Sequence, residues 1–103
     1  MTLSGKDKAA LRAEAHHLQA IVHVGKEGLT PTVFASLDDA LRTRELVKVQ
    51  VGKTVEPPPR DVARALATEA AAEVVQVIGR TCTLYRHNPK LERKKDDPPP
   101  WRR

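Results

Sequence analysis

The chain is most constrained by a strand, glycine loop, helix and second strand that follow one another between residues 20 and 51. Residues 20–24 are rich in β-branched side chains, and residues 46–51 alternate apolar and polar side chains, so both favour strands. Between them, Thr30 is a good N-cap, and Pro31 suits the first helical position because its missing N–H leaves nothing unpaired. A helical crossover between two strands predicts that the strands are parallel.

A first helix is predicted near the N-terminus. Ser4 and Asp7 are three residues apart, which is the spacing of a capping box variant. The apolar residues Leu11, Ala15 and Leu18 then recur at i, i+4 and i+7, the spacing of one helical stripe. We therefore expect one helix whose apolar face reaches Leu18.

A third helix and a hairpin complete the predicted fold. The helix is expected from about Arg60 to Ala71, after a stiff run of three prolines. Residues 73–78 and 81–86 favour strands, and the two-residue connection Gly79-Arg80 suits a type II′ turn. The predicted order is αβαβαββ, an α/β two-layer-type sandwich with a four-stranded mixed sheet.

The loop between the first strand and the second helix is the candidate binding element. Gly25 and Gly28 are three residues apart, which lets another backbone approach without interference from a Cβ atom. The following helix N-terminus offers N–H groups and a partial positive charge to phosphate oxygens, and Lys26 adds a mobile cation. Such a GxxG loop can grip a sugar-phosphate backbone.

The spacing of this loop also excludes two nucleotide-binding motifs. It lacks the third glycine of a dinucleotide-binding fingerprint, and the chain has no Gly-Lys-Ser/Thr run of a P-loop. On spacing alone, a tight strand-to-helix turn without any ligand is the commoner explanation.

Charge and aromatic content limit the partners that such a loop would have. The chain has 18 Lys and Arg against 13 Asp and Glu, a net charge of +5, which favours nucleic acid first and a membrane surface second. Aromatic residues make up only 3% of the chain, so an aromatic platform that stacks bases is excluded. Residues 90–103 are basic and proline-rich and carry +3 of the total, so we expect residues 89–103 to be a disordered tail.

Catalytic, metal-binding and membrane-spanning functions find no support in the residue pattern. His16 and His17 are adjacent and would diverge on a helix, and Cys82 has no partner at a ligand spacing. No stretch approaches the roughly 20 apolar residues of a membrane span, and one cysteine cannot form an internal disulfide. We expect a cytoplasmic, monomeric non-enzyme without metal or cofactor.

Six runs of residues, in order and correctly spaced, resemble the CRM domain of the YhbY family, a group of bacterial RNA-binding proteins. The runs are LSGK at 3–6, LRAEAHHL at 11–18, VHVGKEGLT at 22–30, ELVKV at 45–49, VQVIGRT at 75–81 and LYR at 84–86. The resemblance implies an RNA-binding CRM domain over residues 1–88, with the same αβαβαββ arrangement as the C-terminal domain of a bacterial initiation factor.

The resemblance also implies a function and a set of contact residues. Its bacterial single-domain members are associated with precursors of the large ribosomal subunit, so the implied partner is ribosomal RNA, with ribosomal proteins as further partners. The candidate RNA-binding residues are Gly25, Lys26, Glu27, Gly28, Thr30, Lys48, Lys53, Arg80 and Arg86. Two alternatives remain open: a protein-interaction module on ribosomal or assembly proteins, and a general RNA chaperone or splicing-type factor.

Overall fold

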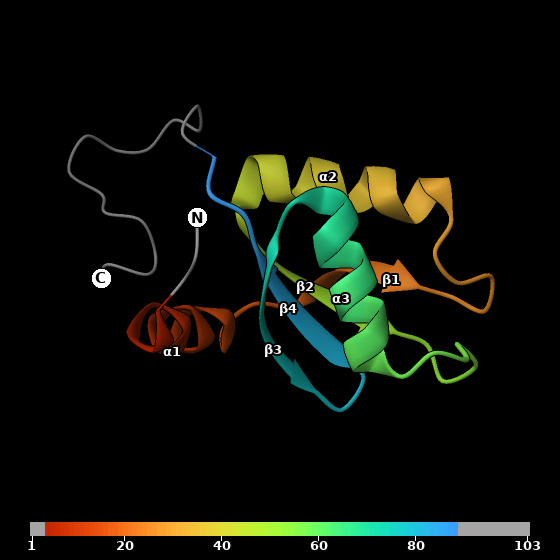
Figure 1. The fold of residues 1–103 in the computed structure, drawn as a ribbon, viewed down its shortest axis with the longest axis horizontal. Helices are drawn as coiled ribbons and strands as arrows, with labels where there is room; N and C mark the ends of the chain where they lie inside the picture. The colour runs from red at the N-terminus through yellow and green to blue at the C-terminus, as the bar shows by residue number, and fades with distance from the viewer. Residues whose placement is uncertain (1–3, 89–103) are drawn as a thin grey trace.

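The computed structural model, which describes residues 4–88, shows a four-stranded mixed sheet with three helices (Figure 1). The elements are α1 (Gly5–Ala15), β1 (Ala20–Val24), α2 (Pro31–Arg44), β2 (Leu46–Val51), α3 (Pro59–Ala70), β3 (Glu73–Ile78) and β4 (Thr81–Tyr85). The predicted order αβαβαββ and the mixed sheet are confirmed. The predicted tail at residues 89–103 lies outside the described residues.

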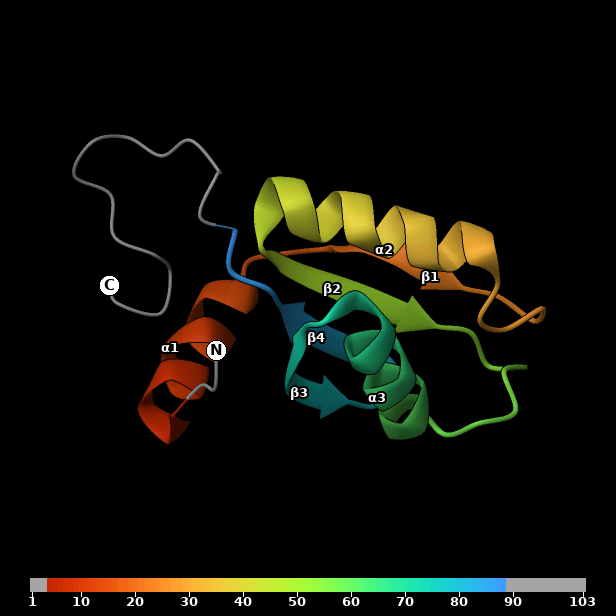
Figure 2. The same ribbon diagram turned by 45° about the horizontal axis from the view of Figure 1, so that its top comes forward.

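The strand order β1-β2-β4-β3 brings three connections to one end of the sheet. β1 is parallel to β2, as predicted, and β4 is antiparallel to both β2 and β3. The strands β1, β2 and β3 therefore point the same way. We call the end where they finish the loop end; it holds the connections at residues 25–30, 52–58 and 79–80 (Figure 2).

The helices α2 and α3 cover one face of the sheet and build the main core. Alternate residues of each strand point to this face, which is the period of a half-buried strand. The core includes Val22, Val24, Val47, Val49 and Val51 from the strands and Leu37, Leu41 and Leu66 from the helices. Full burial of side chains of this size supplies about 2 kcal/mol each, so this face fixes the register of the sheet.

The opposite face is covered by α1 only near the end where β2 begins. There, Leu11 and Ala15 of α1 form a second cluster with Leu46, Val75 and Tyr85. The rest of this face is left open, and its strand positions include Ile21, His23, Lys48 and Gln50. We call this region the open face.

The predicted caps are present and fix where two helices begin. The Ser4 hydroxyl accepts a hydrogen bond from the Asp7 N–H, and the Asp7 carboxylate accepts one from the Ser4 N–H, each at 3.1 Å. The Thr30 hydroxyl accepts a hydrogen bond from the Val33 N–H at 3.2 Å, with Pro31 at the first helical position. Both helices thus begin where local sequence signals placed them.

Three predicted elements have boundaries that differ from the structure by one to three residues. The helix α1 ends at Ala15, and Leu18, predicted to continue its stripe, lies in the connection to β1 and is 39% exposed. The reason is that the chain must leave the helix to cross to the outer edge of the sheet, where β1 lies. The third helix runs from Pro59 to Ala70 rather than from Arg60 to Ala71, and the last strand ends at Tyr85.

A buried glutamate ties the corner between α2 and β2 to the chain beyond β4. Glu45 is only 2% exposed and has a φ of 64°, a backbone conformation that residues other than glycine rarely adopt. Its carboxylate accepts a hydrogen bond from the Asn88 N–H at 2.7 Å and lies 3.2 Å from His87 Nδ1. Its carbonyl accepts from the Arg86 N–H at 2.9 Å. These contacts hold residues 86–88 against the main domain.

The left-handed residue after α3 generates a stability prediction. Ala71 has a φ of 54° and a ψ of 42°, a position that glycine occupies without strain. We expect Ala71→Gly to raise the free energy of unfolding by about 1 kcal/mol, measured by chemical denaturation. The matched control, Ala65→Gly inside α3, should lower it by about 1 kcal/mol because its backbone is helical. A loss of stability in Ala71→Gly would contradict the strain argument.

Candidate nucleic-acid interface

The glycine loop forms a tight turn that presents two charged side chains to solvent. The Gly28 N–H donates to the Gly25 carbonyl at 2.8 Å, which closes the turn. Gly28 has a φ of 76°, so the turn requires a residue without a Cβ at this position. Lys26 and Glu27 occupy the tip and are exposed. The conformation of the loop therefore depends on Gly28.

Gly25 has a different role from Gly28. Its φ is not in the left-handed region, and a Cβ atom there would meet no other atom within 4 Å. The fold therefore does not need glycine at this position. A hollow of about 270 Å³ adjoins it, lined by residues 25–28 with Thr30 and Val33. The bare backbone at Gly25 is free to be approached closely from this hollow.

The N-terminus of α2 offers fewer N–H groups to a ligand than we predicted. The Val33 N–H donates to the Thr30 hydroxyl, the Phe34 N–H donates to the Thr30 carbonyl, and Pro31 has no N–H. Within residues 4–88, Thr32 is the residue of this turn whose N–H has no partner. The first turn contains no acidic residue, so the positive end of the helix dipole remains uncompensated.

Lys53 and Arg80 lie at the same end of the sheet as the glycine loop, and Gly52 connects them to it. The Gly52 N–H donates to the Val24 carbonyl at 2.8 Å, immediately before Gly25. The Arg80 guanidinium donates to the Gly52 carbonyl at 3.0 Å. Lys53 follows Gly52 and is exposed. The structure thus brings Gly25–Gly28, Thr30, Lys53 and Arg80 of the predicted site together.

Gly52, the residue directly after β2, was not among the predicted site residues. A Cβ atom at Gly52 would lie 3.1 Å from the Val24 carbonyl oxygen, closer than ordinary contacts. The absence of a side chain lets the backbone of the two strands meet just before the glycine loop. The sequence signal was a glycine directly after a strand, which also fits a simple strand end.

Two predicted contact residues, Lys48 and Arg86, do not lie with the loop. Lys48 is half-buried on the open face, in the middle of β2. Arg86 follows β4 at the opposite end of the sheet. Its guanidinium donates to the Asp38 carboxylate at 2.8 Å, the Asp38 carbonyl at 3.1 Å and the Ala70 carbonyl at 2.9 Å. Arg86 therefore joins α2 to the end of α3.

The remaining reactive side chain, Cys82, is held in the core. Its sulfur lies 3.4 Å from the Pro59 carbonyl, and burial raises the pKa of the Cys82 thiol to about 11. A thiol with so high a pKa is a poor nucleophile because little thiolate forms near neutral pH. Within residues 4–88, no three His, Cys, Asp or Glu side chains gather closely enough to hold a metal ion. None of the helices in that range is long and apolar enough to cross a bilayer.

One family model and several named proteins match the chain. The model of the CRS1/YhbY (CRM) domain matches residues 3–86. The chain is 42% identical over 86 residues to "Probable RNA-binding protein YqeI" of Bacillus subtilis, covering 84% of this chain and 90% of that protein. It is 40% identical over 85 residues to a Haemophilus influenzae protein named "RNA-binding protein", covering 82% of this chain and 86% of that one.

A solved structure shows the same fold. The solution structure of the hypothetical protein SAV1595 from Staphylococcus aureus superimposes with a TM-score of 0.72 at 33% sequence identity. The match covers 93% of this chain and 95% of that one. The arrangement of helices and strands described above is therefore shared over nearly the whole of both chains.

The contacts of Arg86 predict a large loss of stability on truncation. Arg86→Ala removes three hydrogen bonds from a charged donor, so we expect the free energy of unfolding to fall by about 2 kcal/mol. The control is Arg42→Ala, which breaks an exposed ion pair with Asp39 and should cost less than about 1 kcal/mol. Equal losses in denaturant unfolding would show that Arg86 does not join the helices as described.

The burial of Cys82 predicts a thiol that resists alkylation. A rise in pKa from 9.0 to about 11 lowers the thiolate fraction about a hundredfold at pH 8, and burial limits access further. We expect iodoacetamide to modify Cys82 slowly in the folded protein and quickly in denaturant. A cysteine introduced by Ser36→Cys on the exposed side of α2 should react quickly in the folded protein. Rapid modification of native Cys82 would contradict its burial.

Proposed function

The chain belongs to the CRS1/YhbY (CRM) domain family, and on that premise we propose that it is a non-catalytic RNA-binding protein whose glycine loop contacts the RNA backbone. The observation that supports this proposal most directly is made at Gly25. It is a glycine that the fold does not require, at the tip of a strand, beside a hollow and a helix N-terminus. A position kept free of a side chain without a structural need suits the close approach of a ligand backbone.

The electrostatics around the loop favour phosphate as the group that is bound. Lys26 and Lys53 are exposed and form no ion pair with any residue in the range 4–88. The positive end of the α2 dipole faces the same connection, and Arg80 adds a third basic side chain. Glu27 has the opposite charge, so its contribution would be to accept a hydrogen bond from a ribose hydroxyl or a base amino group.

We further propose that the bound RNA is ribosomal RNA in precursors of the large ribosomal subunit, and that the protein acts there as a cytoplasmic monomer. The support for this finer assignment is the family resemblance of the sequence. The geometry of the loop is compatible with any RNA whose backbone is accessible, because phosphate contacts position a protein without selecting a base sequence.

Salt titration tests whether phosphate contacts supply the affinity. Binding of large-subunit rRNA fragments is measured over a range of salt concentrations, and the affinity should fall steeply as salt rises. Lys26→Ala should weaken binding at every RNA sequence and reduce the slope of log affinity against log salt by about 1. Partners that survive ribonuclease treatment, together with no measurable RNA affinity, would instead assign the protein to protein interaction.

Gly5 and Gly25, two exposed glycines whose φ is not positive, offer a matched test of the loop itself. We expect Gly25→Ala to fold like the wild type and to bind RNA about tenfold more weakly, a loss of about 1.4 kcal/mol, because the methyl group keeps the RNA backbone away. Gly5→Ala, at the start of α1, adds the same methyl group to an equally open position and should leave RNA affinity unchanged without lowering stability.

Thermal unfolding and RNA titration of the two variants decide the outcome. Wild-type RNA affinity in Gly25→Ala would mean that the loop is not the contact. A destabilised Gly25→Ala would mean that the glycine serves the fold.

A further inference from the structure

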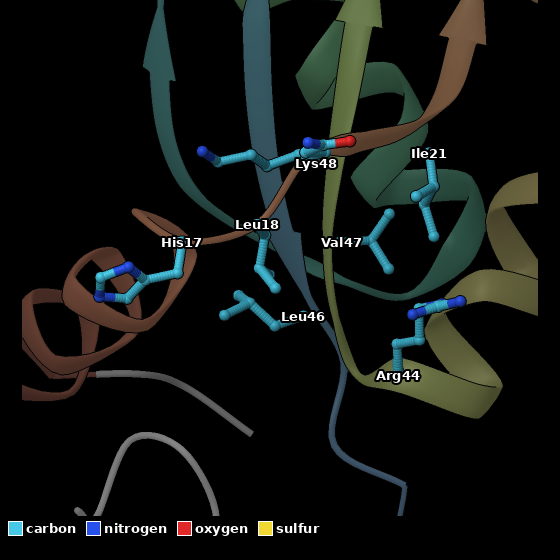
Figure 3. A pocket seen from close by; sticks show the side chains of 8 residues that line it. His17, Leu18, Ile21, Arg44, Leu46, Val47 and Lys48 are labelled. Atoms are coloured by element: carbon cyan, nitrogen blue, oxygen red, sulfur yellow. The ribbon is translucent and has the colours of Figure 1, made fainter.

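A second hollow lies at the opposite end of β1 from the glycine loop. It measures about 220 Å³ and is formed where the connection from α1 to β1 passes the end of α2 and the start of β2. Figure 3 shows Leu18 and Leu46 in its middle, Ile21 and Arg44 to one side, His17 to the other and Lys48 above them. We call it the β1-start hollow.

The charged side chains around the β1-start hollow are basic and unengaged. The side chains of Arg44 and Lys48 form no hydrogen bond or ion pair with any part of the chain between residues 4 and 88, and the ring of His17 lies edge-on to that of His16. No carboxylate lines the hollow. Glu45, next in sequence to Arg44, is buried, and its carboxylate is held by His87 and Asn88.

The floor of the hollow is apolar and unusually exposed for this protein. Within the described residues, the exposed large hydrophobic side chains are Leu18 at 39%, Ile21 at 45% and Ile78 at 66%. Two of these three line this one hollow. An apolar floor beside cationic groups suits a ligand that has both a flat, weakly polar part and an anionic part.

We propose that the β1-start hollow is a second RNA contact, in which Arg44 and Lys48 bind phosphate and Leu18 and Ile21 pack against a ribose or base. The inference rests on the proposed RNA binding and extends it to a site outside the glycine loop. The proposal also assigns a role to Lys48. We predicted Lys48 as a contact residue together with the glycine loop, but its side chain lines this hollow instead.

The position of the hollow lets the RNA bound at the glycine loop reach it as well. β1 is an edge strand, so nothing in the sheet lies on its outer side between the two sites. Its four residue steps span about 13 Å at the rise of a strand. With a rise of about 3.4 Å per nucleotide in a stacked strand, this is about four nucleotides. One RNA backbone can therefore reach both sites.

Removal of one charge from the hollow tests the inference. The probe is a hairpin RNA from the large-subunit rRNA that the wild-type protein binds. We expect Arg44→Ala to weaken its binding about three- to tenfold and to reduce the salt slope by about 1, the effect of one lost phosphate contact. Arg64→Ala is the matched control, because it removes an exposed arginine from α3 that does not line the hollow.

A second readout maps the contact without relying on a variant. In NMR titrations with the hairpin, the amide signals of Leu18, Ile21 and Lys48 should shift together with those of the glycine loop. With a dinucleotide, which cannot span both sites, Arg44→Ala should leave the shifts of the loop unchanged.

The outcomes separate this inference from the proposed function. If the wild-type protein binds no RNA, the proposed function fails and the inference fails with it. If the wild type binds and Gly25→Ala weakens binding, but Arg44→Ala matches Arg64→Ala in affinity and slope, only the second contact is overturned. A complex with a ribosomal protein that resists ribonuclease and requires Arg44, with RNA affinity unchanged, would also overturn it.

Discussion

The parallel pairing of β1 with β2 is the constraint on which the candidate interface depends. It places the ends of both strands at the same edge, so the glycine loop and the connection that carries Lys53 must lie side by side. The pairing continues beyond the ladder, because the Gly52 N–H reaches the Val24 carbonyl. A side chain at Gly52 would press on that carbonyl. The approach of two backbones at this point therefore fixes the base from which the loop projects.

Most of the fold could be predicted because its signals are local. The caps at Ser4 and Thr30, the β-branched strands and the Gly79 turn each act within a few residues, and the structure contains all of them. Leu18 was misplaced because its position depends on where the chain must go next rather than on helical periodicity. The strained backbone at Glu45 was not foreseen, since its partners His87 and Asn88 are more than 40 residues away.

The glycine loop of the candidate site could be predicted from its sequence motif, but the positions of the other site residues around it could not. The GxxG spacing identified the loop, yet it gave both glycines the same role, and only their backbone angles separate a turn requirement at Gly28 from an open backbone at Gly25. The alternation of residues 46–51 predicted a strand, but it did not show which hollow the Lys48 side chain would line. The engagement of Arg86 by Asp38 and Ala70 is a tertiary contact with no local signature.

The distribution of ion pairs explains how a nearly neutral domain can present a positive surface. The 85 described residues contain 12 Lys and Arg against 10 Asp and Glu. If these charges were spread evenly over the surface, the positive electrostatic potential would be weak. On the side of α2, however, the carboxylates of Asp38 and Asp39 pair with Arg86 and Arg42, and the carboxylate of Glu45 is buried and accepts a hydrogen bond from the Asn88 N–H. The cations at the two ends of β1 have no such partners in the described part of the chain. Because unpaired charges at close range dominate the local potential, a polyanion is attracted most strongly to the edge of β1.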